Sequence, residues 1–236
     1  TGQDISPFYD PMVAKIIASG PTRDIARLRL IDALKDTVLF GTCHNRDFLV
    51  ACLEKDTFAA GAATTAFITE EFAEELAKGE IARFVPQFTD SATAAVIELA
   101  LEHQALYAAS VIVSAELRDW ASASPLVSRK QYAFGELTHD LSVTPLGGQN
   151  YRVQDGEQEI TVEVLALENN IGTVRIQGAT HRVHYLQQEP GQLYLSLQGR
   201  AAQYCDLIRI DGAIDTGVGG GSVIAPMHGL LLEIRV

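Results

Sequence analysis

The sequence predicts an α+β fold in which a long central helix is wrapped by an antiparallel β-barrel that follows it along the chain. One helix is expected to begin at Asp90 or Ser91 and to continue past Leu117 without Gly or Pro. It is apolar on nearly every side over residues 105–115, and such a helix needs other elements packed around it. Residues 132–210 then alternate in short runs separated by turns, which is typical of a barrel of seven or eight strands.

The first 88 residues have a mixed pattern. Phe8 to Ser19 is a mostly apolar run closed by a Gly-Pro pair, and it predicts a buried strand. Thr22 is placed to N-cap a helix. A second helix is expected from Arg46 to Lys55, and Thr69 is expected to cap a short acidic helix that follows it directly.

Turn signals divide the expected barrel strands. Gly147-Gly148, Asp155-Gly156 and Pro190-Gly191 each separate two alternating runs. The run from Phe134 to Val143 predicts one strand, and the last strand is expected to continue through Ile208. Side chains fill the interior of an ordinary barrel of about eight strands, so a barrel that holds a helix must be wider or flared.

The composition limits which classes of partner and which cellular compartment are plausible for this chain. The 236 residues carry a net charge of −12, which makes nucleic acid and anionic membrane surfaces poor partners. The apolar stretch from Ala92 to Leu117 contains Glu98 and Glu102, which argue against a membrane span. Three cysteines without a disulfide spacing favour a reduced setting, either the cytoplasm or, in a eukaryote, the mitochondrial matrix.

No group of residues has the pattern of a catalytic or metal site. His181 and His184 lie three apart in a predicted strand and therefore point to opposite faces. Glu136 and Asp140 share a strand face but lie roughly 13 Å apart, too far for a paired acid and base. The Gly-rich residues 217–222 lack the lysine and helix of a phosphate loop and are interpreted as a linker.

Four segments resemble the α subunits of biotin-dependent acyl-CoA carboxylases. Pro7–Met12, with Lys15 after it, is similar to the Y-D-[PS]-M-x-x-K segment of biotin carboxylases, and Asn45–Leu49 is similar to their T-N-x-x-F-L helix. Phe58–Ile68 resembles their closing F-x-x-G…T-x-F-I, and Ala225–Gly229 resembles the A-P-M-P-G start of a biotinyl carrier domain. His44 and His228 depart from the usual Thr and Pro of these motifs.

The resemblance implies a division of the chain. Residues 1–88 would be the C-terminal part of a biotin carboxylase domain, and residues 89–213 would be the helix-and-barrel BT domain. Residues 214–222 would be a linker, and residues 223–236 the truncated start of a carrier domain. The sequence Ile5-Ser6-Pro7-Phe8 favours the 3-methylcrotonyl-CoA or geranyl-CoA carboxylase branch over the propionyl-CoA branch.

The same resemblance implies which functions are absent from this stretch. The parent subunit would use ATP, Mg²⁺ and covalently bound biotin, but its ATP-grasp residues and its biotinyl lysine would lie outside the chain. Tyr9 and Asp10 would line the edge of the parent's active site, and Lys15 would form an ion pair. The expected partners are the carboxyltransferase β subunit and further α subunits, and the chain alone is expected to be inactive.

The sequence leaves three interpretations open. The first is an assembly scaffold, and the second is a segment of a complete ATP-dependent carboxylase. Only residues upstream of this chain distinguish these two. A third possibility is a free-standing β-barrel that binds a small hydrophobic ligand. The apolar helix argues against this last interpretation because it would already fill the barrel.

Overall fold

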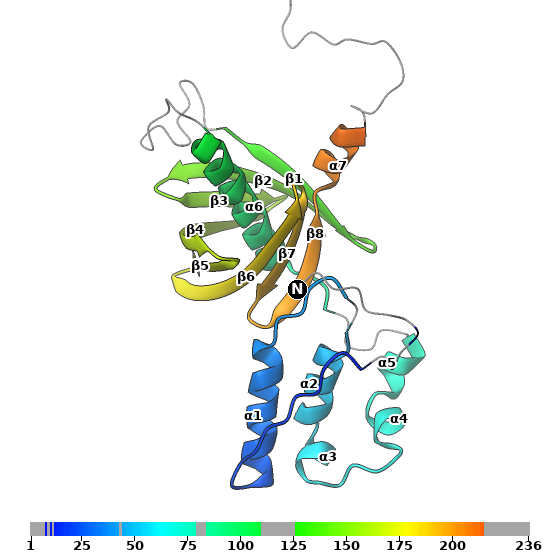
Figure 1. The fold of residues 1–236 in the computed structure, drawn as a ribbon. Coiled ribbons are helices and arrows are strands. Elements are labelled where there is room, and N and C mark those ends of the chain that lie inside the picture. Colours follow the sequence, from blue (N-terminus) through cyan, green and yellow to red (C-terminus); the bar gives the residue numbers. More distant parts are fainter. Residues whose placement is uncertain are drawn as a thin grey trace, which may run out of the picture.

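The computed structural model describes residues 8, 10, 12–42, 44–78, 84–109 and 126–214, with only the backbone for residues 211–214. These residues form a helical part and, adjoining it, a β-barrel with a helix inside (Figure 1). Tyr9, the expected linker and carrier segments, and the expected continuation of the long helix through residues 110–117 lie outside the described residues.

The helical part consists of α1 to α5, and its two cores lie mainly between α1, α2 and the short helices that follow. Thr22 N-caps the first helix as predicted, because its Oγ1 accepts a hydrogen bond from the amide of Ile25 at 3.2 Å. Ile31 and Leu34 pack against Val50 and Leu53 of the second helix. The helices are α1 (Arg23–Asp36), α2 (Arg46–Glu54), α3 (Asp56–Ala59), α4 (Phe67–Glu71) and α5 (Ala73–Lys78).

Three predictions for this part are wrong. Residues 12–20 run extended but form no strand, since they pair with none of the described residues, and Ile17 is 80% exposed. Thr69 caps nothing, because it lies inside α4, where its hydroxyl donates to the carbonyl of Ala66. The acidic helix is split at Phe72 into α4 and α5.

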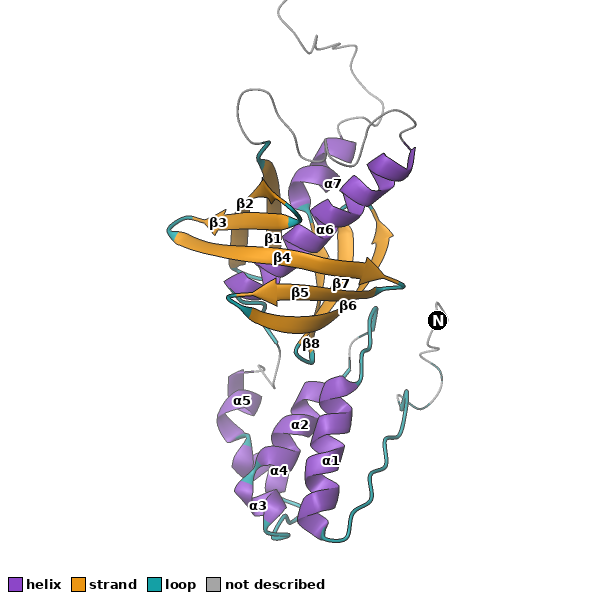
Figure 2. Cartoon of the chain, turned by 90° about the vertical axis from the view of Figure 1, so that its left-hand side faces the viewer, coloured by secondary structure: helices purple, strands orange, loops and turns teal. Residues whose placement is uncertain are grey.

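The barrel is a single antiparallel sheet with the strands in sequence order, nearly closed on itself. Figure 2 shows α6 (Phe88–Ala109) passing through it, with strands on both sides of the helix. The predicted helix within an eight-stranded barrel is confirmed. The strands are β1 (Ser128–Phe134), β2 (Leu137–Gly147), β3 (Asn150–Asp155), β4 (Gln158–Glu168), β5 (Ile171–Ile176), β6 (Ala179–Glu189), β7 (Gln192–Leu197) and β8 (Arg200–Cys205).

Helix α6 is buried along its first half, which differs from the prediction. Every residue from Asp90 to Ala100 is buried, whereas residues 104–106 beyond them are exposed. The helix also begins earlier than expected, at Phe88. Asp90 occupies the first turn, and its carboxylate accepts a hydrogen bond from the amide of Gln87 at 3.0 Å, as the acidic residue of a capping box does.

The barrel is built from a repeated hairpin of one long and one short strand. The long strands β2, β4 and β6 start at Leu137, Gln158 and Ala179, an even spacing of 21 residues, and β8 starts at Arg200, 21 residues further on. The register repeats as well. Equivalent cross-strand pairs are Val143 with Val153, Val164 with Val174, and Tyr185 with Leu195.

Two expected strands have different bounds. The run from Phe134 to Val143 is interrupted by a turn at Gly135, whose φ of 68° is readily adopted only by glycine. The last strand ends at Cys205 and does not reach Ile208, because residues Leu207–Ile214 form α7. Glu136 therefore lies in the turn and does not share a strand face with Asp140.

Arg46 and Gly199 join the helical part to the barrel. The Arg46 side chain is 3% exposed and donates to the carbonyl oxygens of Thr37, at 2.6 Å, and of Gly199 in the β7–β8 turn. Gly199 has a φ of 74°, and a Cβ atom built on it would lie 2.7 Å from the carbonyl oxygen of Lys35 in α1. Because both contacts involve backbone atoms, the junction leaves little room for side-chain adjustment.

We expect Ala95→Leu to destabilise the barrel strongly. Ala95 is fully buried between α6 and the strands, so a larger side chain forces its neighbours apart and lowers the free energy of unfolding by about 1–3 kcal/mol. Ala105→Leu on the exposed half of the same helix is the control, with an expected change within about 0.5 kcal/mol. Urea unfolding followed by circular dichroism measures both, and equal effects would show that α6 is not tightly enclosed.

We also expect Gly199→Ala to cost more stability than Gly156→Ala. Both glycines have positive φ in turns between strands, but a Cβ on Gly156 meets nothing within 4 Å. The backbone strain is therefore common to both variants, and the excess of about 1–3 kcal/mol for Gly199→Ala reports the clash with Lys35. If thermal and urea unfolding give the same loss for both variants, the junction is looser than this contact implies.

Candidate functional site

A cluster of charged side chains lies between α6, β1 and the start of α7. Lys130 of β1 is 3% exposed, and its ammonium lies 2.9 Å from Glu98 Oε1, 3.0 Å from Glu102 Oε1 and 3.3 Å from Asp206 Oδ2. Glu98 is fully buried and also accepts a hydrogen bond from the Tyr132 hydroxyl at 2.7 Å. The three carboxylates thus surround a single buried cation.

The positions of these residues follow from the two periodicities. Glu98 and Glu102 lie four apart on α6 and so project from the same helix face. Lys130 and Tyr132 lie two apart on β1 and so point to the same side of the sheet, toward the helix. A buried charge needs partners of opposite sign, and this geometry supplies them.

The protonation of the cluster favours a structural role. Burial disfavours the charged form of Lys130, but the adjacent Glu98 and Glu102 outweigh this and raise the pKa of the amine. Burial, and then the charge of Glu98, raise the pKa of Tyr132 well above its usual range. A general base or amine nucleophile would need the opposite direction for Lys130. The cluster is therefore suited to holding α6, β1 and α7 together.

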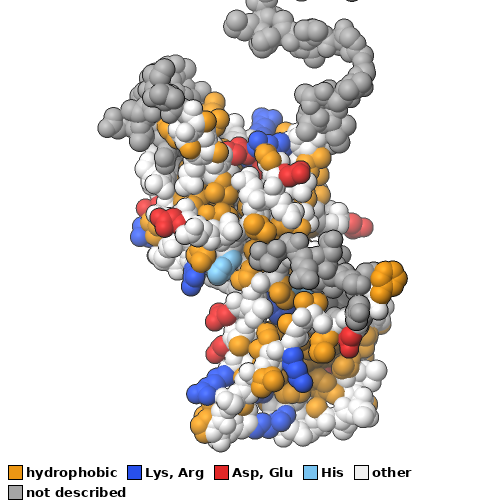
Figure 3. All heavy atoms as spheres, viewed as in Figure 1, with side chains coloured by type: hydrophobic (Ala, Val, Ile, Leu, Met, Phe, Trp, Pro, Cys, Tyr) orange, Lys and Arg blue, Asp and Glu red, His pale blue; other side chains and the backbone are white. Residues whose placement is uncertain are grey.

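An apolar groove lies in the helical part, between the extended residues 12–16 and helices α1 and α2. It has a volume of about 830 Å³, and hydrophobic side chains gather on the face of this part seen in Figure 3. Asp10 lies at its edge and is exposed, and its carboxylate accepts a hydrogen bond from the amide of Met12 at 3.0 Å, as in a turn. Burial raises the pKa of the Cys52 thiol in the groove wall, which disfavours a reactive thiolate.

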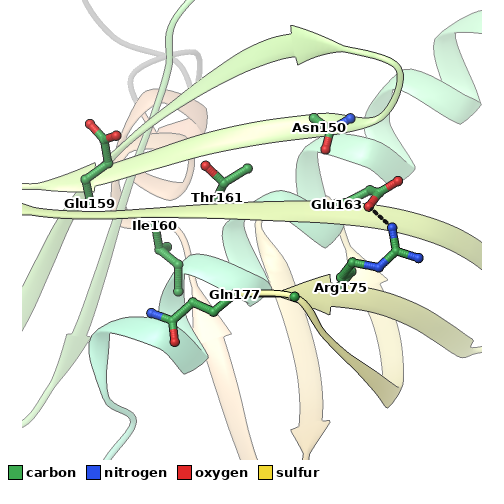
Figure 4. A pocket seen from close by; sticks show the side chains of 8 residues that line it. Asn150, Glu159, Ile160, Thr161, Glu163, Arg175 and Gln177 are labelled. Carbon is green, nitrogen blue, oxygen red and sulfur yellow. Dashed lines mark hydrogen bonds and ion pairs between the residues drawn. The ribbon is translucent and has the colours of Figure 1, made fainter.

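A second, polar depression of about 350 Å³ lies on the outer face of β3, β4 and β5 (Figure 4). Glu163 and Arg175 point toward each other from neighbouring strands and form an ion pair of 2.5 Å. Glu159, near the start of β4, forms an ion pair with Arg152 at 3.7 Å. Both carboxylates are thus engaged by arginines, and the depression does not contain a free pair of acids.

The expected active-site edge at Tyr9 and Asp10 stays a prediction. Tyr9 lies outside the described residues, and Lys15 is exposed without a salt bridge to any described residue. His181 contacts Gln198 at 3.1 Å, and His184 lies on the other face of β6. No three His, Cys, Asp or Glu side chains of the described segments lie close enough together to hold a metal ion.

The sequence interpretation missed the charged cluster, although a signal was present. Glu98 and Glu102 stand inside the most apolar helix of the chain, and charged residues at such positions are rarely buried without a partner. Their spacing of four residues predicts one shared partner. Which strand supplies it depends on the barrel register, which a single sequence does not reveal.

Comparison with known proteins identifies the class to which the helical part corresponds. Residues 1–70 match the family model of the biotin carboxylase C-terminal domain. A biotin carboxylase of Halalkalibacterium halodurans is 47% identical over 68 residues, which is 29% of this chain and 15% of that protein. The predicted resemblance to biotin carboxylases is thereby confirmed for this region.

Two further relatives are α chains of acyl-CoA carboxylases. The propionyl-CoA carboxylase alpha chain of Ruegeria pomeroyi is 42% identical over 73 residues, 31% of this chain and 11% of that protein. The mitochondrial propionyl-CoA carboxylase alpha chain of Mus musculus is 28% identical over 202 residues, 80% of this chain and 26% of that protein. The chain is therefore related to biotin carboxylases and acyl-CoA carboxylase α subunits, and it spans about a quarter or less of the length of these relatives.

No helix among the described residues has both the length and the apolar character needed to cross a membrane.

We expect Tyr132→Phe to weaken the loss of stability at alkaline pH. The unfolded chain releases a tyrosine proton near pH ~10, whereas the raised pKa keeps folded Tyr132 protonated, so stability falls as pH rises above that value. Each such proton contributes a slope of about 1.4 kcal/mol per pH unit, which phenylalanine removes. Lys130 and Tyr204, whose pKa values are also raised, retain their share.

The measurement is a series of urea unfolding curves from pH 9 to pH 11.5 for the wild type and the variant. A variant slope equal to that of the wild type would mean that Tyr132 titrates normally in the folded chain. The Tyr132 hydroxyl would then be accessible to solvent, contrary to its buried hydrogen bond with Glu98.

Proposed function

We propose that this chain is part of the α subunit of a biotin-dependent acyl-CoA carboxylase and that its helix-and-barrel unit is the BT domain, which docks on the carboxyltransferase β subunit. The carrying observation is that similarity to a propionyl-CoA carboxylase alpha chain covers 80% of the chain, well beyond the 70 residues of the carboxylase match. The barrel is therefore part of the resemblance.

The contacts between the helical part and the barrel are consistent with the proposed role in assembly. Arg46 lies in the Asn45–Leu49 segment that resembles the carboxylase helix, and it donates directly to the barrel at Gly199. Phe40 stacks on Tyr194 of β7, with ring centroids 5.5 Å apart. A barrel held in this way to the carboxylase region transmits the position of a docked partner to that region.

The described residues do not fit a site for the parent's cofactors. They contain no cluster able to hold Mg²⁺, and the buried lysine is committed to three carboxylates. ATP, Mg²⁺ and biotin would therefore be bound by other parts of the whole subunit. That subunit would carboxylate biotin with ATP and bicarbonate, and the β subunit would pass the carboxyl group to an acyl-CoA.

We propose that the acyl-CoA substrate is 3-methylcrotonyl-CoA, geranyl-CoA or propionyl-CoA. Residues 5–8 favour the 3-methylcrotonyl-CoA or geranyl-CoA branch, whereas two of the relatives described above are propionyl-CoA carboxylase alpha chains. In this scheme the acyl-CoA pocket belongs to the β subunit, so the described residues do not discriminate between the substrates. The ligand-binding alternative has lost its main support, because α6 fills the barrel interior with fully buried side chains from Ala92 to Ile97.

We expect the chain to form a stable complex with the carboxyltransferase β subunit of the same organism. The measurement is size-exclusion chromatography with light scattering, on the chain alone, the β subunit alone and their mixture. The chain alone is expected to show no biotin-dependent ATP hydrolysis.

The control for this experiment is the Gly199→Ala variant, in which the barrel remains but its junction with the helical part is disturbed. Co-elution of both forms would show that binding of the β subunit does not depend on the junction. A chain that is folded by circular dichroism and still elutes apart from the β subunit would contradict the assembly role. Biotin-dependent ATP hydrolysis by the chain alone would contradict the assignment of catalysis to other parts of the subunit.

A further inference from the structure

The barrel repeat is complete three times and is interrupted at its fourth occurrence. The long strands of the complete units have 11 residues each, whereas β8 starts at the repeat position Arg200 and stops at Cys205. The residues that would form its second half, 206–210, instead lead into and form the first part of α7. The hydrogen bond from the Asp206 amide to the Gly191 carbonyl still follows the repeat, since Val164 and Tyr185 make the equivalent bonds.

Strand β1 occupies the place of the short strand of this fourth unit. It ends at Phe134, 21 residues before Asp155, where the short strand of the first complete unit ends. Extending the repeated register puts Asp206 opposite Tyr132 and Leu207 opposite Gln131. Among the described residues, β8 and β1 form no ladder, and the Gln131 amide donates instead to Asp206 Oδ1 at 3.2 Å.

The segment after Asp206 suits a strand as well as a helix. Residues 207–210 are Leu-Ile-Arg-Ile, in which three residues are apolar and two of these are β-branched, a composition that strands favour. In the helix, Ile208 is 48% exposed. By the repeat, Ile208 corresponds to Pro145, which is buried, to Gln187, which is partly buried, and to Ala166, which is exposed, because the long strands shift register at or next to this place.

Helix α7 has few features of its own that stabilise it. It contains eight residues, one of which is Gly212, and isolated helices of that length are unstable in water. Its anchors are the Arg209 ion pair with Glu102 and the contact of Asp206 with Lys130. Arg209 is 39% exposed, so its ion pair with Glu102 contributes little to holding the helix in place.

We propose that residues 206–210 are a two-state element, which is helical in the form described here and extends β8 in a second form, pairing with β1 to close the barrel. In the second form the Arg209–Glu102 pair is broken. Because a strand advances about 3.3 Å per residue and a helix about 1.5 Å, the conversion moves the point at which the following chain leaves the barrel.

The first test uses Leu207→Pro with Leu207→Ala as its matched control. Position 207 is the first residue of α7, where proline is well tolerated because that N–H has no partner within the helix. In the extended form, Leu207 and Gln131 would exchange hydrogen bonds, which proline prevents. Both substitutions remove the leucine side chain, so only proline is expected to eliminate the extended form.

The readout is chemical-exchange saturation transfer NMR on the deuterated 236-residue chain. We expect the wild type and Leu207→Ala to show a minor state, of about 0.1–10%, with strand-type Cα shifts at residues 207–210. Leu207→Pro is expected to lose it. Helical shifts without exchange in the wild type and in Leu207→Ala, or an unchanged minor state in Leu207→Pro, would overturn the proposal.

A second variant keeps the test decisive if Leu207→Pro fails to fold. Arg209→Ala removes the ion pair with Glu102 that is present only in the helical form, so the minor population is expected to rise about two- to fivefold. Arg209→Lys retains a cation and is expected to stay near the wild-type population. An Arg209→Ala chain whose residues 207–210 remain helical and free of exchange would contradict a two-state segment.

Discussion

The fold depends on one constraint: the first half of α6 must be enclosed by the sheet, although the helix carries the carboxylate of Glu98 near its middle. Ala92 to Ile97 have no exposed surface, and Glu98 directly after them is also fully buried. An enclosing sheet satisfies the apolar residues, but the charge needs a cation at the same depth. Lys130 provides it from β1, which fixes where the first strand of the barrel lies relative to the helix.

The repeat shows how the barrel reaches around the helix. Lys130 stands one repeat before Tyr151, two before Gly172 and three before Leu193, so it occupies a core-facing position that the complete units fill with neutral residues. The charge pair is thus confined to the incomplete unit. There the Asp206 side chain bridges the two ends of the sheet, by accepting from the Gln131 amide and contacting Lys130, where the other units use a backbone ladder.

The sequence predicted the features that are encoded locally. The Thr22 cap, the turns at Gly147-Gly148 and Asp155-Gly156, and the enclosed helix all depend on residues adjacent to them or on one helix face. The failures have a different origin. The extended residues 12–20 have strand-like composition but form no ladder with the described residues. Residues 207–210 also have strand-like composition but are helical, and Asp206 and Arg209 hold them by contacts with Lys130 and Glu102.

The candidate site could be predicted only in part, for the same reason. Helical spacing places Glu98 and Glu102 on one face, but their shared partner Lys130 comes from the start of the barrel sequence. Asp206, the third carboxylate around that lysine, comes from its end, so the four side chains meet only when the two ends of the sheet lie together. The cluster therefore reports that the whole barrel has formed. A lysine kept charged by such neighbours is suited to holding the buried elements of the barrel together and unsuited to proton transfer.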